Sequence, residues 1–286
     1  MRDIEVRTHQ GPTSGPHLVV LGAVHGNEPQ GSAAIQKVSD ELSSGILTLT
    51  SGTLTLVPVA NRPAYDAGKR YLEEDLNRIF RKTAEPTSSE ARLANELTGL
   101  IDRADVLLDI HTTSAPGPSC VFIDFPTPAN RALASVVGAE YALLNWPELY
   151  EQDSRFDSYD TTRYAFESGK DGIIVETGQH GEPEAAIRAY QVILRILRHL
   201  GMAAEYPREE LPAFVPITMT ALYQKNLPGD MFTRDWRHLE TVPAGSVVAR
   251  LEDGTEIRVG RDMVMLLPKY HARPGEEWFY LGERVR

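Results

Sequence analysis

The sequence contains a single cysteine, Cys120, among its 286 residues. One cysteine excludes an intramolecular disulfide and predicts a reducing, cytoplasmic location. Cys120 lies in the apolar stretch SCVFIDF, where we expect a buried thiol that packs as a small hydrophobe, the alternative being a catalytic nucleophile.

Long apolar runs are also missing. No stretch approaches the roughly eighteen residues that a membrane-spanning helix requires, and the first ten residues, MRDIEVRTHQ, lack the apolar segment of a signal peptide. With 42% hydrophobic and 24% charged residues, the composition is that of an ordinary globular protein. We therefore expect no membrane partner and no targeting segment.

Basic residues are in deficit, with 29 Lys and Arg against 40 Asp and Glu and a formal net charge of −11. This balance argues against nucleic acid or an anionic membrane as a partner, because both require a basic surface. A small anionic substrate remains compatible, since a few arginines can bind a carboxylate inside an acidic protein. The oligomeric state is left open, with a homo-oligomer among the alternatives.

The first two hundred residues alternate between short apolar segments and amphipathic helical patterns. Strands are expected over 17–24, 53–60, 105–110, 119–125 and 172–176. Helices are expected over 28–42, after the capping-box sequence at 87–90, and over 183–200. This alternation predicts an α/β fold in which a mixed, mostly parallel sheet is flanked by helices.

The pattern changes after about residue 205, where helical periodicity disappears. Short strand-like segments at 246–251, 256–259 and 263–267 are separated by glycines and prolines, and Asp253-Gly254 predicts a hairpin between the first two. We therefore predict two domains, a catalytic α/β domain over 1–205 and a smaller β-rich domain over 206–286.

Chemically capable side chains follow the expected strands. His25 and Glu28 lie three residues apart after the first of them, and His111 comes directly after the segment DVLLDI. Two histidines and one carboxylate are a common catalytic zinc set, whereas the pair alone is also typical of a loop that closes a strand. Asp109 could orient a histidine ring or simply end the strand.

Glu176 ends the apolar segment GIIVE, where it could act as a general base on a metal-bound water. A helix cap or a salt bridge is the alternative role. The segment GKRYLEEDLNRIF and the segment YDTTRY supply arginines that could bind a carboxylate, although solvated surface arginines are the alternative. His9 and His180 are interpreted as surface residues.

The motifs HGNE, RYLEEDLNRIF, DIHTT, YDTTR and VETG, in this order, resemble the aspartoacylase and succinylglutamate desuccinylase family of zinc deacylases, which is related to the metallocarboxypeptidases. The resemblance spans roughly residues 17–200 and implies a zinc carboxypeptidase-like fold. His111-Thr112-Thr113 lacks the asparagine that aspartoacylases carry after the second histidine, and 114–158 resembles neither subgroup, so the substrate stays open.

The resemblance implies a role for each matching residue. One zinc ion per subunit would be held by His25, Glu28 and His111. Glu176 would activate water, and Arg70 would polarise the scissile carbonyl. The substrate would be bound by Asn77, Arg78, Tyr159, Arg163 and, through a looser match, Tyr270.

The expected activity is zinc-dependent hydrolysis of the amide bond of a small anionic N-acyl amino acid. The alternatives are a succinylglutamate desuccinylase-type activity, a metallocarboxypeptidase that acts on peptides, and a sensor that binds metal or carboxylate without turnover. A sensor has no need of a general base, so Glu176 argues against that last alternative.

Overall fold

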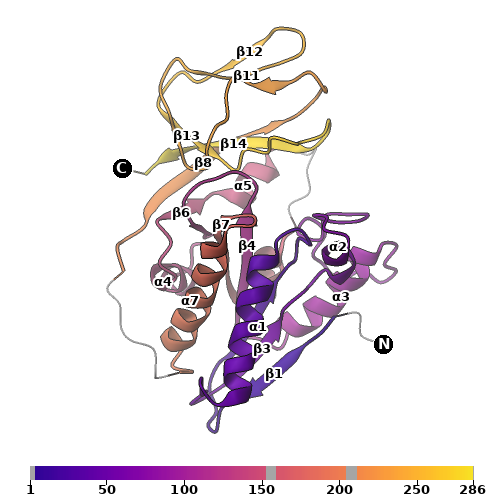
Figure 1. Ribbon diagram of the computed structural model, residues 1–286, viewed down its shortest axis with the longest axis vertical. Helices are drawn as coiled ribbons and strands as arrows, with labels where there is room; N and C mark the ends of the chain where they lie inside the picture. Colours follow the sequence, from indigo (N-terminus) through magenta and orange to yellow (C-terminus); the bar gives the residue numbers. More distant parts are fainter. Residues whose placement is uncertain (1–3, 153–158, 204–210, 286) are drawn as a thin grey trace.

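The computed structural model describes residues 4–152, 159–203 and 211–285. Its centre is an eleven-stranded sheet in the order β1-β3-β2-β4-β7-β5-β6-β8-β14-β13-β10, beside a separate three-stranded sheet in the order β12-β11-β9 (Figure 1). The strands are β1 (Arg7–Gln10), β2 (His17–Gly22), β3 (Thr53–Val57), β4 (Val106–Thr113), β5 (Cys120–Phe122), β6 (Tyr141–Leu144), β7 (Asp171–Gln179), β8 (Val215–Gln224), β9 (Met231–Phe232), β10 (Thr241–Val242), β11 (Val247–Arg250), β12 (Glu256–Arg258), β13 (Met263–Leu266) and β14 (Glu277–Arg284).

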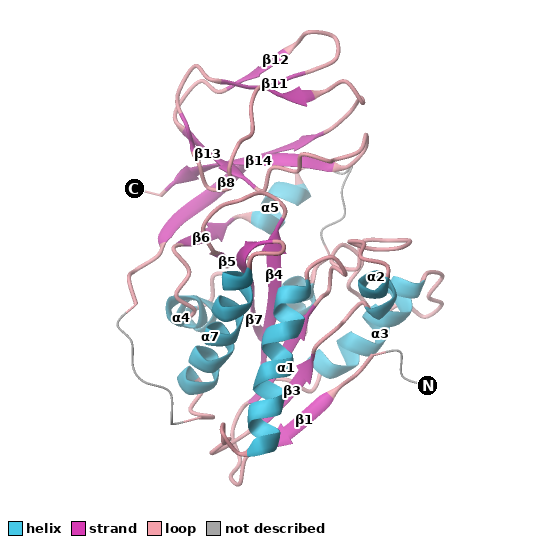
Figure 2. Cartoon of the chain, in the orientation of Figure 1, coloured by secondary structure: helices cyan, strands magenta, loops and turns pink. Residues whose placement is uncertain are grey.

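Helices cover both faces of the large sheet (Figure 2). They are α1 (Pro29–Ser44), α2 (Arg62–Asp66), α3 (Ser89–Ile101), α4 (Pro128–Val136), α5 (Trp146–Glu151), α6 (Thr161–Glu167) and α7 (Pro183–His199). None of the helices within the described ranges is long and apolar enough to cross a membrane.

The parallel strands β3, β2, β4 and β7 form the buried centre of the sheet. One face packs against α1, α4 and α7, where Ile35, Leu133 and Ile193 belong to one apolar cluster. The other face packs against α3 and α6, where Leu97 and Ala165 belong to a second cluster. Burial on both faces accounts for the nearly continuous apolar sequence of these strands, and the predicted α/β fold with helices on both faces is confirmed.

The two strands that carry His111 and Glu176 are longer than the sequence predicts. β4 continues to Thr113, so His111 lies within the strand and not after it. β7 continues to Gln179, and the register places His111 directly beside Glu176. β5 then runs antiparallel to β7 with Cys120 opposite Glu176, which makes the sheet mixed.

The C-terminal part adds strands to both sheets. The Asp253-Gly254 hairpin is confirmed, because β11 and β12 pair in antiparallel fashion on either side of it. The sequence did not predict β8 and β14, the two longest strands of this part, which extend the central sheet beyond β6. Since one sheet runs through both parts, the two-domain division at residue 205 stays a prediction.

Candidate metal centre and active site

The carboxyl ends of β2, β4 and β7 meet at one edge of the sheet, where a cavity of about 540 Å³ opens. This is the edge at which open α/β sheets bind their ligands. Gly26 is required here, because a Cβ atom would lie 2.2 Å from the backbone of Ala64. The tight approach of α2 therefore fixes the loop that carries His25 and Glu28.

His25, Glu28 and His111 form a buried group that could hold a metal ion, called here the metal cluster. The Nδ1 atoms of the two histidines lie 3.0 Å apart. Glu28 contributes one carboxylate oxygen 2.9 Å from His25 Nδ1 and the other 3.1 Å from His111 Nδ1. The three potential ligand atoms thus lie within 4.8 Å of one another. Two imidazoles and one carboxylate are a donor set that zinc prefers.

Two further carboxylates lie behind the histidine rings. Asp109 Oδ2 is 3.0 Å from His111 Nε2, and Asp75 Oδ1 is 3.2 Å from His25 Nε2. Such partners fix the orientation of a ligating ring. The role expected of Asp109 thus fits its position, whereas Asp75 was missed, although it lies in the segment GKRYLEEDLNRIF.

The electrostatics of the cluster reflect this density of carboxylates. Burial opposes ionisation of Glu28, but the charges of His25 and His111 outweigh it and hold the pKa of Glu28 well below its usual value. Burial alone would lower the pKa of His111, yet Asp109 and Glu28 raise it well above its usual value. The cluster therefore favours positive charge at its centre.

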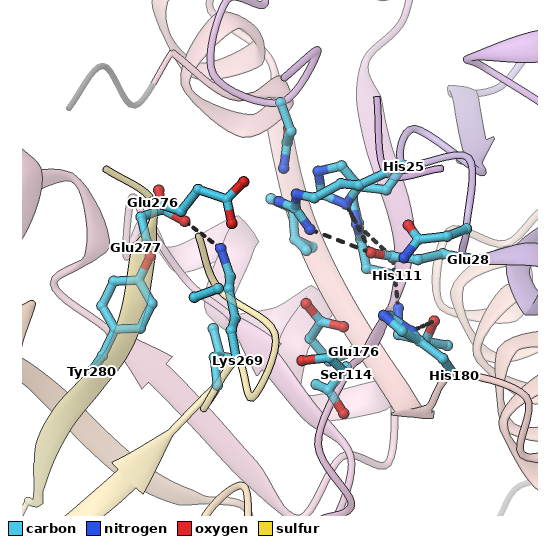
Figure 3. Close-up of a pocket in the computed structure, with 18 of the residues that line it drawn as sticks. His25, Glu28, His111, Ser114, Glu176, His180, Lys269, Glu276, Glu277 and Tyr280 are labelled. Carbon is cyan, nitrogen blue, oxygen red and sulfur yellow. Dashed lines mark hydrogen bonds and ion pairs between the residues drawn. The ribbon is translucent and has the colours of Figure 1, made fainter. Parts of the chain in front are cut away.

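Glu176 lies in the wall of the same cavity, and its Oε2 is buried without a hydrogen-bond partner among the described residues. Burial and the nearby charge of Glu28 raise the pKa of Glu176 to about 8. Figure 3 shows this side chain between the metal cluster and Lys269 in the chosen view. A carboxyl group in this environment can exchange a proton near neutral pH.

Arg70 reaches the metal cluster from the loop that follows α2. Its Nη1 lies 3.6 Å from Glu28 Oε1, and its Nε donates a 2.9 Å hydrogen bond to Asp75 Oδ2. The guanidinium lines the cavity, where it can donate to a substrate oxygen.

Asn77 and Arg78 also line the cavity, but Arg78 already has a partner. Its Nε and Nη2 donate hydrogen bonds of 2.8 Å and 3.0 Å to the two carboxylate oxygens of Glu277, at the start of β14. Lys269 Nζ lies 2.7 Å from the same carboxylate. Arg78, Lys269 and Glu277 are called here the β14 cluster, and together Arg78 and Lys269 hold the pKa of Glu277 well below its usual value despite its burial.

The remaining predicted substrate residues lie in different places. Tyr270 lines the cavity, with its hydroxyl donated to the carbonyl of Trp236. Tyr159 and Arg163 are not among the described residues of the cavity wall. Arg163 pairs with Glu167 at 3.1 Å on α6 and lies over the Tyr159 ring, 5.2 Å from its centroid.

Sequence reasoning also missed His180, which it placed on the surface. The structure makes this side chain part of the cavity wall, with Nδ1 2.8 Å from the hydroxyl of Thr112. Burial lowers its pKa. Lys269 and Glu277 were missed as well, and no local motif marks either of them.

The sequence profile of the succinylglutamate desuccinylase/aspartoacylase catalytic domain matches residues 14–200. The chain belongs to this family. A probable aspartoacylase from Prochlorococcus marinus (strain NATL2A) is 32% identical over 174 residues, which cover 58% of this chain and 54% of the relative. The match thus spans about half the length of that relative.

Longer matches agree with this assignment. The N-alpha-acetyl-L-2,4-diaminobutyric acid deacetylase of Halomonas elongata is 27% identical over 281 residues, covering 90% of this chain and 79% of the relative. A crystal structure of a succinylglutamate desuccinylase/aspartoacylase from Rhodobacter sphaeroides has a TM-score of 0.77 at 20% identity, covering 99% of this chain and 89% of that one. The family's fold therefore extends over the whole chain.

Proposed function

We propose that this family member is a zinc-dependent amidohydrolase that cleaves the amide bond of an N-acyl amino acid into a carboxylate and a free amine. The observation that carries the proposal is one cavity that holds both the metal cluster and the Glu176 carboxyl, whose Oε2 is buried and has no hydrogen-bond partner among the described residues. The names of the relatives, an aspartoacylase and a deacetylase of an N-acetylated amino acid, support the same reaction class.

The residues of the metal cluster fit zinc, because three buried ligand atoms from two imidazoles and a carboxylate lie within 4.8 Å of one another. Held by His25, Glu28 and His111, zinc would supply a Lewis acid that lowers the pKa of bound water toward neutrality. Asp109 and Asp75 would keep the two rings oriented toward the ion.

The chain's own groups supply the proton transfers. The Glu176 carboxylate accepts a proton from the attacking water and later donates it to the leaving amine nitrogen. Arg70 donates hydrogen bonds to the carbonyl oxygen as negative charge develops there. Asn77 and Arg78 are proposed to receive the α-carboxylate, with Glu277 fixing the direction of the Arg78 guanidinium.

Three further expectations stay proposals. Tyr159 and Arg163 would take part in binding only through a rearrangement of α6, because both lie outside the described cavity wall. Tyr270 would help to close the cavity over the substrate. The identity of the acyl group is left to experiment.

A hydrolysis screen of N-acetyl, N-formyl and N-succinyl amino acids with the zinc-loaded protein tests the proposal, with Glu176→Gln as the diagnostic variant. Glu176→Gln should retain zinc and lose about 10²- to 10⁴-fold in kcat, as expected for removal of a general acid–base. The exposed Glu184→Gln on α7 is the matched control. A protein that binds zinc and hydrolyses none of these substrates would refute the proposal, and cleavage of blocked dipeptides alone would indicate a carboxypeptidase.

A further inference from the structure

Two buried carboxyl groups in the cavity wall play no part in the proposed reaction. Asp124 and Asp160 both line the cavity and are exposed by only 3% and 1%. Asp124 follows β5, and Asp160 is the N-cap of α6, where it accepts a 2.8 Å hydrogen bond from the Arg163 amide. They are called here the acid pair.

The acid pair has too few hydrogen-bond donors for its carboxylate oxygens. Thr162 Oγ1 lies 2.5 Å from Asp124 Oδ2 and 2.8 Å from Asp160 Oδ1, but one hydroxyl carries one proton and can donate to only one of them. Asp124 Oδ1 is buried and has no hydrogen-bond partner among the described residues. A buried carboxylate oxygen without a donor is costly, and an N–H donor would relieve that cost.

No cation within the described chain pairs with these carboxyls. Arg78, which is close enough to influence both, directs its hydrogen bonds to Glu277, Tyr150 and the Asn77 carbonyl. Lys269 is likewise bound to Glu277. Burial and the charge of Asp160 accordingly raise the pKa of Asp124 well above its usual value.

Apolar side chains lie between Glu176 and Asp124 along β5 and β7. Cys120 lies opposite Glu176 and Phe122 opposite Ile174, so β5 leads from the reacting end toward Asp124. Every two strand residues advance roughly 7 Å. Phe122, Ile174 and Trp146 are among the residues that line the cavity. A substrate side chain with an aliphatic stem and a cationic end would match this arrangement, with the stem against the apolar side chains and the cation at the acid pair.

We propose that the acid pair is a specificity subsite for a protonated amine at the end of the substrate side chain. The preferred substrates are then N-acyl amino acids with an aliphatic, amine-terminated side chain. An ammonium group would donate to Asp124 Oδ1 and take the place of the proton that the pair otherwise retains, while a neutral alkyl end would make no hydrogen bond to either carboxyl. This inference rests on the proposed function, because it assigns the side-chain end of the same substrate.

Hydrolysis of matched substrates by the zinc-loaded full chain tests the subsite. Nα-acetyl-lysine and Nα-acetyl-ornithine should exceed Nα-acetyl-norleucine in kcat/KM by about ten-fold or more, as expected for a buried charge-assisted contact. Asp124→Asn should lower kcat/KM for the lysine substrate at least about ten-fold more than for the norleucine substrate, mainly through KM. Equal losses, or a preference for norleucine or for Nα-acetyl-glutamate, would overturn the inference.

Product binding gives a readout that does not need turnover. Calorimetry should show lysine binding to the zinc-loaded wild type about ten-fold more tightly than norleucine, with the difference lost in Asp124→Asn and in Asp160→Asn. The exposed Asp66→Asn, whose carboxylate pairs with Arg62 outside the cavity, is the folding-neutral control. Equal binding of the two amino acids by the wild type refutes the subsite even if hydrolysis occurs. Lysine binding that depends on Asp124, without hydrolysis of any N-acetyl, N-formyl or N-succinyl amino acid, refutes the proposed function instead.

Discussion

The metal cluster and the β14 cluster face the same cavity, and they differ in how their charges are balanced. In the metal cluster, two ring nitrogens and a carboxylate point at one another, with His25 and His111 Nδ1 only 3.0 Å apart. In the β14 cluster, Glu277 already accepts from both Arg78 and Lys269. The first arrangement needs a cation to satisfy it, whereas the second is an internal salt-bridge network.

This difference separates a group of side chains suited to hold an ion from a group whose charges already pair with one another. The ligand atoms of the metal cluster are brought together by neighbouring parallel strands, and the arrangement is suited to hold a metal ion. Glu277 and Lys269 come from the C-terminal part and meet Arg78 from the N-terminal part. The β14 cluster therefore ties the two parts of the chain together at the cavity.

Removing one ligand from the metal cluster should have the largest effect. His111→Ala deletes one of three protein ligands, so we expect loss of bound zinc and a fall of hydrolysis to background. Metal analysis and a hydrolysis assay measure the two outcomes. The exposed His199→Ala, at the end of α7, should change neither. Full zinc content in His111→Ala would show that the cluster is not the metal site.

Breaking the β14 cluster should cost stability and leave zinc in place. Glu277→Ala leaves two partly buried cations without their carboxylate, and loss of one partner of a buried ion pair costs up to about 3–5 kcal/mol in the free energy of unfolding. Urea unfolding measures the cost, with the adjacent Glu276→Ala as control. A fall in zinc content of Glu277→Ala would mean that the two clusters depend on one another.

Glu176 should make the metal-free protein less stable as pH rises. Its folded pKa of about 8 exceeds the unfolded value near 4.5, so the folded state holds a proton that the unfolded state has lost between these limits. The stabilisation that protonated Glu176 contributes to the folded state is fully present below the unfolded pKa. It is lost as the pH rises through the folded pKa. In the metal-free protein, Glu176→Gln should therefore gain stability over wild type, by a few kcal/mol at most, between pH 5 and pH 8.

Melting temperatures of both proteins at pH 5 and pH 8, with and without zinc, measure this effect. Bound zinc lowers the cost of a charged Glu176, so the difference between wild type and Glu176→Gln should shrink when the ion is present. A constant difference across this pH range would contradict the raised pKa of Glu176.

The sequence was most informative where site residues follow from short spacing or from the ends of parallel strands. The His25-Glu28 pair is set by three residues of spacing, and parallel strands bring His111 and Glu176 to the same sheet edge. The fold class could be predicted for the same reason, since buried parallel strands and amphipathic helices leave strong periodic patterns.

Long-range contacts left no such pattern. Arg78 and Glu277 are 199 residues apart, and their pairing depends on β14, which sequence periodicity did not reveal. His180 joins the cavity wall because the end of β7 lies beside Thr112, and this tertiary contact leaves no spacing pattern in the sequence. The YDTTR motif marked Arg163 as a candidate but did not predict α6 or the direction of the Arg163 side chain, which depends on how that helix packs.

A matched pair of glycines tests whether the two parts of the chain unfold together. Gly45, which ends α1, and Gly254, in the β11–β12 hairpin, have φ values of 76° and 87°, and a Cβ atom would meet nothing within 4 Å at either. Alanine at each should cost about 1 kcal/mol, because only the left-handed backbone is penalised. Since β6 pairs with β8 in one continuous sheet, both variants should shift a single unfolding transition by similar amounts in calorimetry. A Gly254→Ala variant that shifts one of two separate transitions would instead favour independent domains on either side of residue 205, with the β14 cluster too weak to couple them.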